Sequence, residues 1–226
     1  MKFSQLIRQE ADPIWQASFN HPFVQGVADG TLPLDRFRYY VMQDSYYLST
    51  FARVQSLAGA KAESFAVTNR MAIHAQGTYE AEMALHRTFA KLLKITKQEQ
   101  QAFKPAPTAY AYSSHMYRAA QFGHLGDIIA AILPCYWLYY EIGELLKSAT
   151  PGEPIYQEWI NTYGSDWFKD LVEEQIDRID EVAETVTEAD RTRMKEHFLL
   201  SSQYEYLFWE MAYTLEKWPI EAYQNK

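Results

Sequence analysis

The sequence contains a single cysteine, Cys135, among its 226 residues. One thiol cannot form an internal disulfide, which favours a reducing compartment. The N-terminal segment, residues 1–13 (MKFSQLIRQEADP), becomes charged too early for a signal peptide. The sequence also suggests that no apolar run is long enough to span a bilayer. We therefore expect a soluble, cytoplasmic protein.

Basic residues are scarce relative to acidic ones. The chain has 21 Lys and Arg against 29 Asp and Glu, which gives a net charge of −8 and a pI of about 5.3. An acidic protein is a poor partner for the phosphates of nucleic acids or anionic lipids. We therefore expect neither nucleic acid nor a membrane as a partner.

Several motifs are missing. The sequence has no P-loop, GxGxxG, His-Glu-x-x-His or zinc-ligand spacing. A di-iron carboxylate bundle would need Glu-x-x-His, which is also missing, and Glu82 and His86 are better explained as a solvated helix face. We predict no metal site. No repeat or linker divides the chain, so residues 1–226 are predicted to form one domain whose last few residues are a tail.

Helical patterns and aromatic side chains are abundant. No Asn-Gly hairpin or sustained alternation of period 2 occurs, so we predict an all-α fold. Aromatic residues make up 15% of the chain and include 17 tyrosines, whose hydroxyls need partners when buried. This surplus predicts a polar, ring-lined cavity, wide subunit contacts, or both. Among the expected helices are those near residues 33–61, 64–93, 110–122, 166–186 and 187–219.

The most apolar stretch is Ile128–Glu144, with the sequence IIAAILPCYWLYYEIGE. A helix that is apolar on nearly every face should be buried on all sides. Pro134 has no N–H and presses on the carbonyl of Ala130, so the helix should bend or open next to Cys135. Cys135 and Tyr139 are four residues apart and share a face. A thiol and a phenol in an aromatic helix suggest a lined pocket, although an inert buried cysteine is more common in such a stretch.

A carboxylate lies within an aromatic stripe on the helix expected at residues 33–61. Tyr40, Asp44, Tyr47 and Phe51 follow one another at helical spacing and so share a face. A plain core face should exclude an unpaired carboxylate. Asp44 is therefore either a functional group in a cavity or a residue at the edge of the stripe that pairs with a basic side chain, and the pattern favours neither alternative.

A second carboxylate lies among rings near the C-terminus. Glu205 is flanked by Tyr204, Phe208 and Trp209. The alternative is that Glu205, or its neighbour Glu210, is simply exposed. One thiol, two embedded carboxylates and several tyrosines suit nucleophilic and general acid chemistry on a flat, polar, aromatic substrate.

Four separated stretches of this chain resemble the TenA/thiaminase II family. They are DPIWQASFNHPFVQGVADGTLPLDRFRYYVMQDSYYL near the N-terminus, the central AAILPCYWLYYEIGE, then TYGSDWF, and finally YEYLFWEMAY. The resemblance implies an all-α, single-domain bundle of the haem-oxygenase-like type without haem, assembled as a homotetramer. It also implies an aminopyrimidine aminohydrolase that needs no cofactor. Such an enzyme converts 4-amino-5-aminomethyl-2-methylpyrimidine to the 5-hydroxymethyl compound and cleaves thiamine by the same chemistry.

The resemblance also assigns roles to individual residues. It implies that Cys135 is the nucleophile, that Glu205 is the proton donor and that Tyr47 supports the thiol. Asp44 resembles the family's substrate-binding acid. The remaining substrate-binding positions implied by the resemblance are Tyr139, Tyr163, Tyr112 and Phe208.

Two other functional classes are considered. A cofactor-free oxidase of the kind that completes pyrroloquinoline quinone should carry more His, Arg and Lys around its acidic substrate. A non-catalytic regulator would not need Cys135, Glu205 and Asp44 together, and its acidic charge disfavours direct DNA binding.

Overall fold

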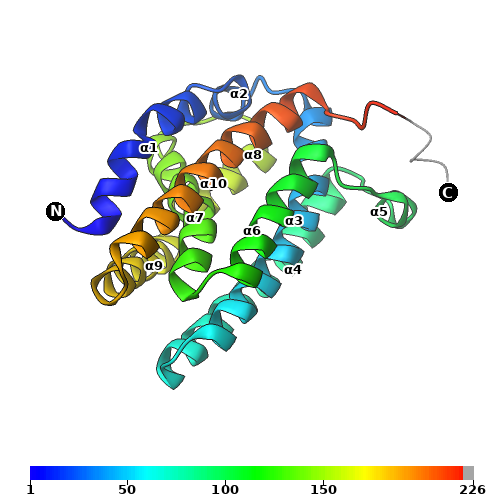
Figure 1. The fold of residues 1–226 in the computed structure, drawn as a ribbon. Helices are drawn as coiled ribbons and strands as arrows, with labels where there is room; N and C mark the ends of the chain where they lie inside the picture. Colours follow the sequence, from blue (N-terminus) through cyan, green and yellow to red (C-terminus); the bar gives the residue numbers. More distant parts are fainter. Residues whose placement is uncertain (221–226) are drawn as a thin grey trace.

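The computed structural model describes residues 1–220, apart from the side chains of residues 81–87. The predicted C-terminal tail and the Glu82 and His86 side chains lie outside this description. Within it the elements are all helices and no strand occurs, which confirms the all-α prediction (Figure 1). The helices are α1 (Phe3–Phe19), α2 (Pro22–Asp29), α3 (Leu34–Lys61), α4 (Phe65–Leu92), α5 (Lys97–Ala102), α6 (Pro107–Phe122), α7 (Leu125–Leu145), α8 (Pro154–Tyr163), α9 (Asp166–Thr185) and α10 (Glu188–Thr214).

Helix α7 is central to the bundle. It packs against α3, α6, α8, α9 and α10, and most of its side chains are buried. By length and composition alone α7 could cross a membrane, with a mean hydropathy of 1.2, so the expectation that no apolar run is long enough was wrong. In the 18-residue stretch of α7 over which this hydropathy is averaged, 72% is buried inside the protein, as expected for a core helix. Its uniform apolarity follows from having protein on every side.

Pro134 does not end this helix. Helix α7 continues from Leu125 to Leu145 through the proline. Pro134 cannot donate a hydrogen bond to the preceding turn. In that turn, the Ser201 hydroxyl of α10 donates to the Ala131 carbonyl at 2.7 Å. The contact joins α10 to α7 one turn before Cys135 and helps to set the position of the cysteine.

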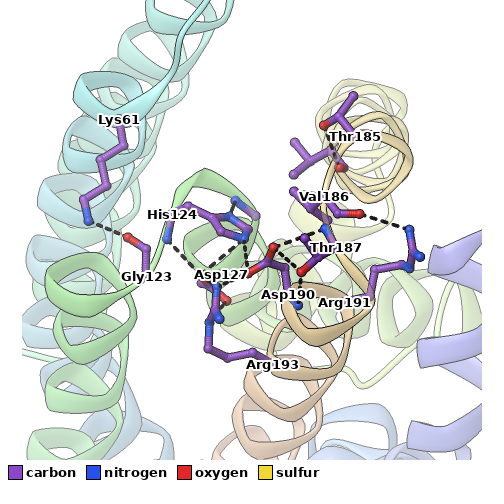
Figure 2. Close-up of polar contacts among 12 residues, drawn as sticks. Lys61, Gly123, His124, Asp127, Thr185, Val186, Thr187, Asp190, Arg191 and Arg193 are labelled. Carbon is purple, nitrogen blue, oxygen red and sulfur yellow. Dashed lines mark hydrogen bonds and ion pairs between the residues drawn. The ribbon is translucent and has the colours of Figure 1, made fainter.

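The start of α7 is held by an ion pair between a buried aspartate and a half-exposed arginine (Figure 2). The Asp127 side chain is completely buried and accepts two hydrogen bonds of 2.9 Å from Arg193 of α10. Asp127 is the third residue of the helix and also accepts from the backbone N–H of the capping residue, His124, at 2.8 Å. A Cβ at Gly123 would lie 2.5 Å from Asp127, so this corner requires glycine. The cluster fixes where α7 begins relative to α6 and α10.

Two expected helix ends differ in the structure. Helix α6 begins at Pro107, which occupies the first turn without needing a donor. Helix α10 stops at Thr214, where Leu215 adopts a left-handed conformation with φ of 56°, several residues before Pro219. The Glu216 carboxylate then accepts from the Thr108 backbone N–H at 2.9 Å, at the start of α6. This tertiary contact ends one helix and caps another.

Candidate active site

A cavity of about 310 Å³ lies between α3, α4, α7, α9 and the end of α8. Its volume is typical of the smaller ligand sites. Four of the eight predicted site residues line it, namely Asp44, Cys135, Tyr139 and Tyr163. The other four, Tyr47, Tyr112, Glu205 and Phe208, are not among its lining residues but pack in a buried layer beside Cys135. Residues from separate parts of the chain therefore meet around one thiol.

Cys135 is a free, half-buried cysteine. Burial raises the pKa of its thiol well above the usual value, and the nearby Glu205 and Asp44 carboxyl groups act in the same direction. The Tyr47 hydroxyl opposes them and lowers the pKa. The resting form is therefore the neutral thiol, and a nucleophilic role requires a group that takes its proton.

Glu205 is a buried acid that is hydrogen-bonded to a tyrosine hydroxyl. Its side chain comes from α10, is 2% exposed, and accepts a hydrogen bond of 2.6 Å from the Tyr112 hydroxyl. Burial raises the pKa of Glu205 to about 8, although the Tyr112 hydrogen bond lowers it. The alternative of an exposed Glu205 is excluded. At neutral pH most of this carboxyl group is protonated, which is the state of a general acid.

Tyr47 and its neighbours form the buried layer beside the thiol. The Tyr47 hydroxyl has no hydrogen bond of ordinary geometry within the described part of the chain, yet it lies close enough to Cys135 to lower the thiol pKa. Its ring lies 4.8 Å from that of Tyr112 and 5.7 Å from that of Phe208, measured between centroids. The hydroxyl is thus placed to donate to a thiolate when one forms.

The opposite side of the site is phenolic and acidic. The Tyr40 hydroxyl donates to the Tyr139 hydroxyl at 3.3 Å, and the Tyr139 and Tyr163 rings are 4.8 Å apart. A Cβ at Gly143 would lie 2.4 Å from the Tyr163 backbone, so glycine lets the end of α8 reach α7. Burial is the main cause that raises the pKa of both Tyr139 and Tyr163, and Asp44, which lines the cavity, acts in the same direction. A ring held here would meet a carboxylate and two phenols.

One part of the wall was missed by the sequence analysis. His74 and Thr78 of α4, together with Tyr136 of α7, line the cavity and are joined to buried Gln55 of α3. A usable signal existed, because Gln55 extends the aromatic stripe of α3 by one turn beyond Phe51 and Tyr136 follows Cys135 directly. The partner helix could not be inferred from those positions.

No group of three His, Cys, Asp or Glu that could hold a metal occurs among the residues whose side chains are described. The residues around the thiol are instead hydroxyls, carboxyls and rings. That donor set suits an organic ring with exocyclic nitrogen atoms.

Comparison with known proteins identifies the family. Residues 8–215 match the TENA/THI-4/PQQC family. The chain belongs to this family. It is 62% identical over 222 residues to the aminopyrimidine aminohydrolase of Bacillus subtilis strain 168, covering 98% of this chain and 94% of that protein.

Solved structures support the TENA/THI-4/PQQC assignment and the fold. A TenA homologue from P. horikoshii OT3 superposes with a TM-score of 0.86 at 30% identity, over 95% of this chain and 99% of the other. A domain from Shewanella denitrificans described as having a heme oxygenase-like fold gives a TM-score of 0.74 at 17% identity, over 95% and 93% of the two chains. The predicted haem-oxygenase-like architecture is confirmed.

Proposed function

We propose that this protein is an aminopyrimidine aminohydrolase, a hydrolase acting on C–N bonds that functions in thiamine salvage. The observation that carries the proposal is Glu205, a buried acid with a pKa of about 8, electrostatically coupled to the Cys135 thiol beside a cavity lined by phenols and Asp44. The curated relative at 62% identity carries the same activity in its name. The substrate is 4-amino-5-aminomethyl-2-methylpyrimidine, and the products are the 5-hydroxymethyl compound and ammonia.

Substrate binding uses the acidic and phenolic side of the cavity. The Asp44 carboxylate accepts from the 4-amino group and fixes the orientation of the ring. Tyr139 and Tyr163 contact the ring from α7 and α8, while Tyr112 and Phe208 hold Tyr47 in place from behind. The aromatic walls exclude water from the reacting carbon.

Addition of the thiol is the first covalent step. Glu205 gives its proton to a ring nitrogen, which makes the adjacent ring carbon electrophilic. The resulting Glu205 carboxylate takes the proton of the Cys135 thiol, and the sulfur bonds to that carbon. The net result is transfer of the thiol proton to the ring nitrogen, and Glu205 is neutral again. Tyr47 donates to the sulfur while it carries negative charge.

Loss of the amine and attack by water complete the reaction. The enamine of the adduct expels the amine from the 5-methylene carbon, and the C–N bonding pair leaves with the nitrogen. Water adds to that carbon as hydroxide and gives its other proton to the released amine. The ring nitrogen then loses its proton as the C–S bond breaks, so the sulfur leaves as the thiol and the ring is aromatic again. The same sequence would release the thiazole alcohol from thiamine, so we propose thiamine cleavage as a second activity of this site. None of these steps needs a cofactor.

The cofactor-free oxidase is less well supported. Such an enzyme would hold an acidic substrate with basic side chains, but no Lys or Arg is among the described residues that line the cavity. A non-catalytic regulator would have no use for a raised Glu205 pKa next to a thiol.

Assembly as a homotetramer is part of the proposal. Leu57 of α3 and Tyr117 and Phe122 of α6 line one surface depression, and the Phe122 side chain is 79% exposed. Exposed apolar groups that lie together favour a protein contact. We also propose that the protein is cytoplasmic, in keeping with its lone cysteine.

One incubation tests the proposed activity. Purified protein is mixed with the aminomethylpyrimidine, and released ammonia and hydroxymethylpyrimidine are measured together. Equal amounts of the two products are expected. Absence of both, from protein that is folded by circular dichroism, would refute the proposed function.

A further inference from the structure

One wall of the cavity is backed by a chain of buried and half-buried polar side chains that the proposed reaction does not use. It consists of Gln55 from α3, His74 and Thr78 from α4, Tyr136 from α7 and Glu174 from α9. His74 and Gln55 are almost completely buried. Burying a polar group is unfavourable unless it has a hydrogen-bond partner, so the donor and the acceptor of each hydrogen bond in this chain can be assigned in turn.

The neighbours of His74 assign its proton to Nε2. That atom lies 3.3 Å from Oε2 of Glu174, whose pKa is lowered chiefly by the hydrogen bond from Arg70, so Glu174 is ionised and can only accept. The Gln175 amide nitrogen is placed 2.9 Å from the same nitrogen, while its Oε1 has no partner in the described part of the chain. The two ends of an amide have almost the same shape, and exchanging them gives Oε1 a partner in the His74 N–H. With its oxygen turned toward the ring, Gln175 accepts the same proton. Burial lowers the pKa of His74, so the imidazole is neutral and Nδ1 is an acceptor.

The hydroxyl protons of Tyr136 and Thr78 are therefore both used in hydrogen bonds within the protein. The Tyr136 hydroxyl lies 3.1 Å from Nδ1 of His74 and donates to it, while the Gln55 amide N–H donates to the Tyr136 oxygen. The Thr78 hydroxyl donates to Oε1 of Gln55 at 3.0 Å. Tyr136, His74 and Thr78 all line the cavity. Toward a bound molecule, the oxygens of Tyr136 and Thr78 can act only as acceptors.

The charge around these two oxygens favours a cation. Asp44 and Glu80 also line the cavity, and the described lining residues include no Lys or Arg. His74 is neutral, so it adds no positive charge to this wall. The Tyr136 and Phe168 rings add aromatic surface to the same wall. A protonated primary amine, which has three N–H donors and no acceptor, matches this wall.

We propose that Tyr136 and Thr78 form the subsite for the protonated amino group on the substrate's methylene carbon, and that His74 is the positioning residue that keeps Tyr136 an acceptor. This inference rests on the proposed aminohydrolase function. The subsite selects a leaving nitrogen that carries N–H groups. A thiazolium nitrogen has none, so it would gain nothing from these two oxygens.

Binding measurements in the Cys135→Ser protein test the subsite, because the ligand then remains intact. Calorimetry compares 4-amino-5-aminomethyl-2-methylpyrimidine with 4-amino-2,5-dimethylpyrimidine, which has the same ring and no amine. Each ligand is titrated into the parent, Tyr136→Phe and Thr78→Val. The matched control is Tyr156→Phe, which removes a buried hydroxyl that donates to the Leu32 carbonyl at 2.6 Å, away from the cavity.

Tyr136→Phe should weaken binding of the amine roughly 10- to 100-fold, the usual effect of losing a hydrogen bond to a charged group, and binding of the dimethyl compound less than about threefold. Thr78→Val should give a smaller loss in the same direction, and Tyr156→Phe should affect the two ligands equally. In the active protein, Tyr136→Phe should raise KM for the amine by more than KM for thiamine.

Equal losses for the two ligands in Tyr136→Phe would overturn the inference, as would a parent protein that does not bind the amine more tightly than the dimethyl compound. If thermal denaturation shows that Tyr136→Phe is unfolded, Thr78→Val decides, and unchanged amine binding by Thr78→Val overturns the subsite. Failure of the proposed function is separate, because it is judged by ammonia release from the wild-type protein.

Discussion

Replacing Glu205 by glutamine should flatten the pH dependence of folding stability. Burial raises the pKa of Glu205 from 4.5 to about 8 in the folded protein. Below pH 4.5 the carboxyl is protonated in both the folded and the unfolded chain, so its contribution to stability is fully present. As the pH rises toward 8, the unfolded chain ionises and the folded protein does not, so the free energy of unfolding falls until the pH passes the folded pKa.

The size of this effect follows from the two pKa values. The pKa of Glu205 in the folded protein, about 8, exceeds the unfolded value of 4.5 by 3.5. One unit corresponds to about 1.36 kcal/mol, so the wild-type protein should lose roughly 3 kcal/mol by neutral pH and roughly 5 kcal/mol at most above pH 8. Glutamine has no proton to lose, but its buried amide N–H groups need new partners, at a cost of about 1–3 kcal/mol. Glu205→Gln should be the less stable protein in acid and the more stable one in alkali.

Urea denaturation at about pH 5, 7 and 9 measures the free energy of unfolding of both proteins. Glu196→Gln is the control, because Glu196 is an exposed carboxylate on the same helix and should keep the wild-type pH dependence. Activity of Glu205→Gln should fall on the order of 10²–10⁴-fold, the range for loss of a general acid. Parallel stability curves for wild type and Glu205→Gln would refute the buried, protonated state of Glu205.

Four further predictions concern catalysis, binding, folding and assembly. Cys135→Ser should reduce single-turnover hydrolysis to near background, while calorimetry still detects pyrimidine binding. The loss of activity in Cys135→Ser should not add to the loss in Glu205→Gln, because both residues act on one step. Substantial residual turnover in Cys135→Ser would argue against covalent catalysis. Asp44→Asn should lower kcat/KM by roughly 2–4 kcal/mol by mispairing the 4-amino group, and an unchanged value would place Asp44 outside the binding site. Asp127→Asn should lower the free energy of unfolding in urea by about 2–3 kcal/mol by disrupting the paired hydrogen bonds of Arg193, with no change in KM for the folded protein. The chain of 26.4 kDa should sediment as a tetramer, and a monomer at all concentrations would contradict the assembly.

Local chemistry made much of the fold predictable. The helices expected near residues 166–186 and 187–219 begin where predicted, because Ser165 caps α9 and Thr187 forms a capping box at α10. Helical spacing also singled out Asp44 and Glu205 as carboxyl groups among rings. Both signals act over a single turn, so the sequence holds them without knowledge of the tertiary structure.

Contacts between distant segments decided the remaining features. The end of α10 and the start of α6 depend on the contact between Glu216 and Thr108. The wall of the cavity on which Tyr136 and Thr78 act as acceptors depends on α9, which places Glu174 beside His74. The sequence alone determined that Glu205 is a carboxyl group in an aromatic stripe. Only the tertiary structure made it an acid with a pKa of about 8, because that value arises from the loss of water when α10 packs against α6 and α7.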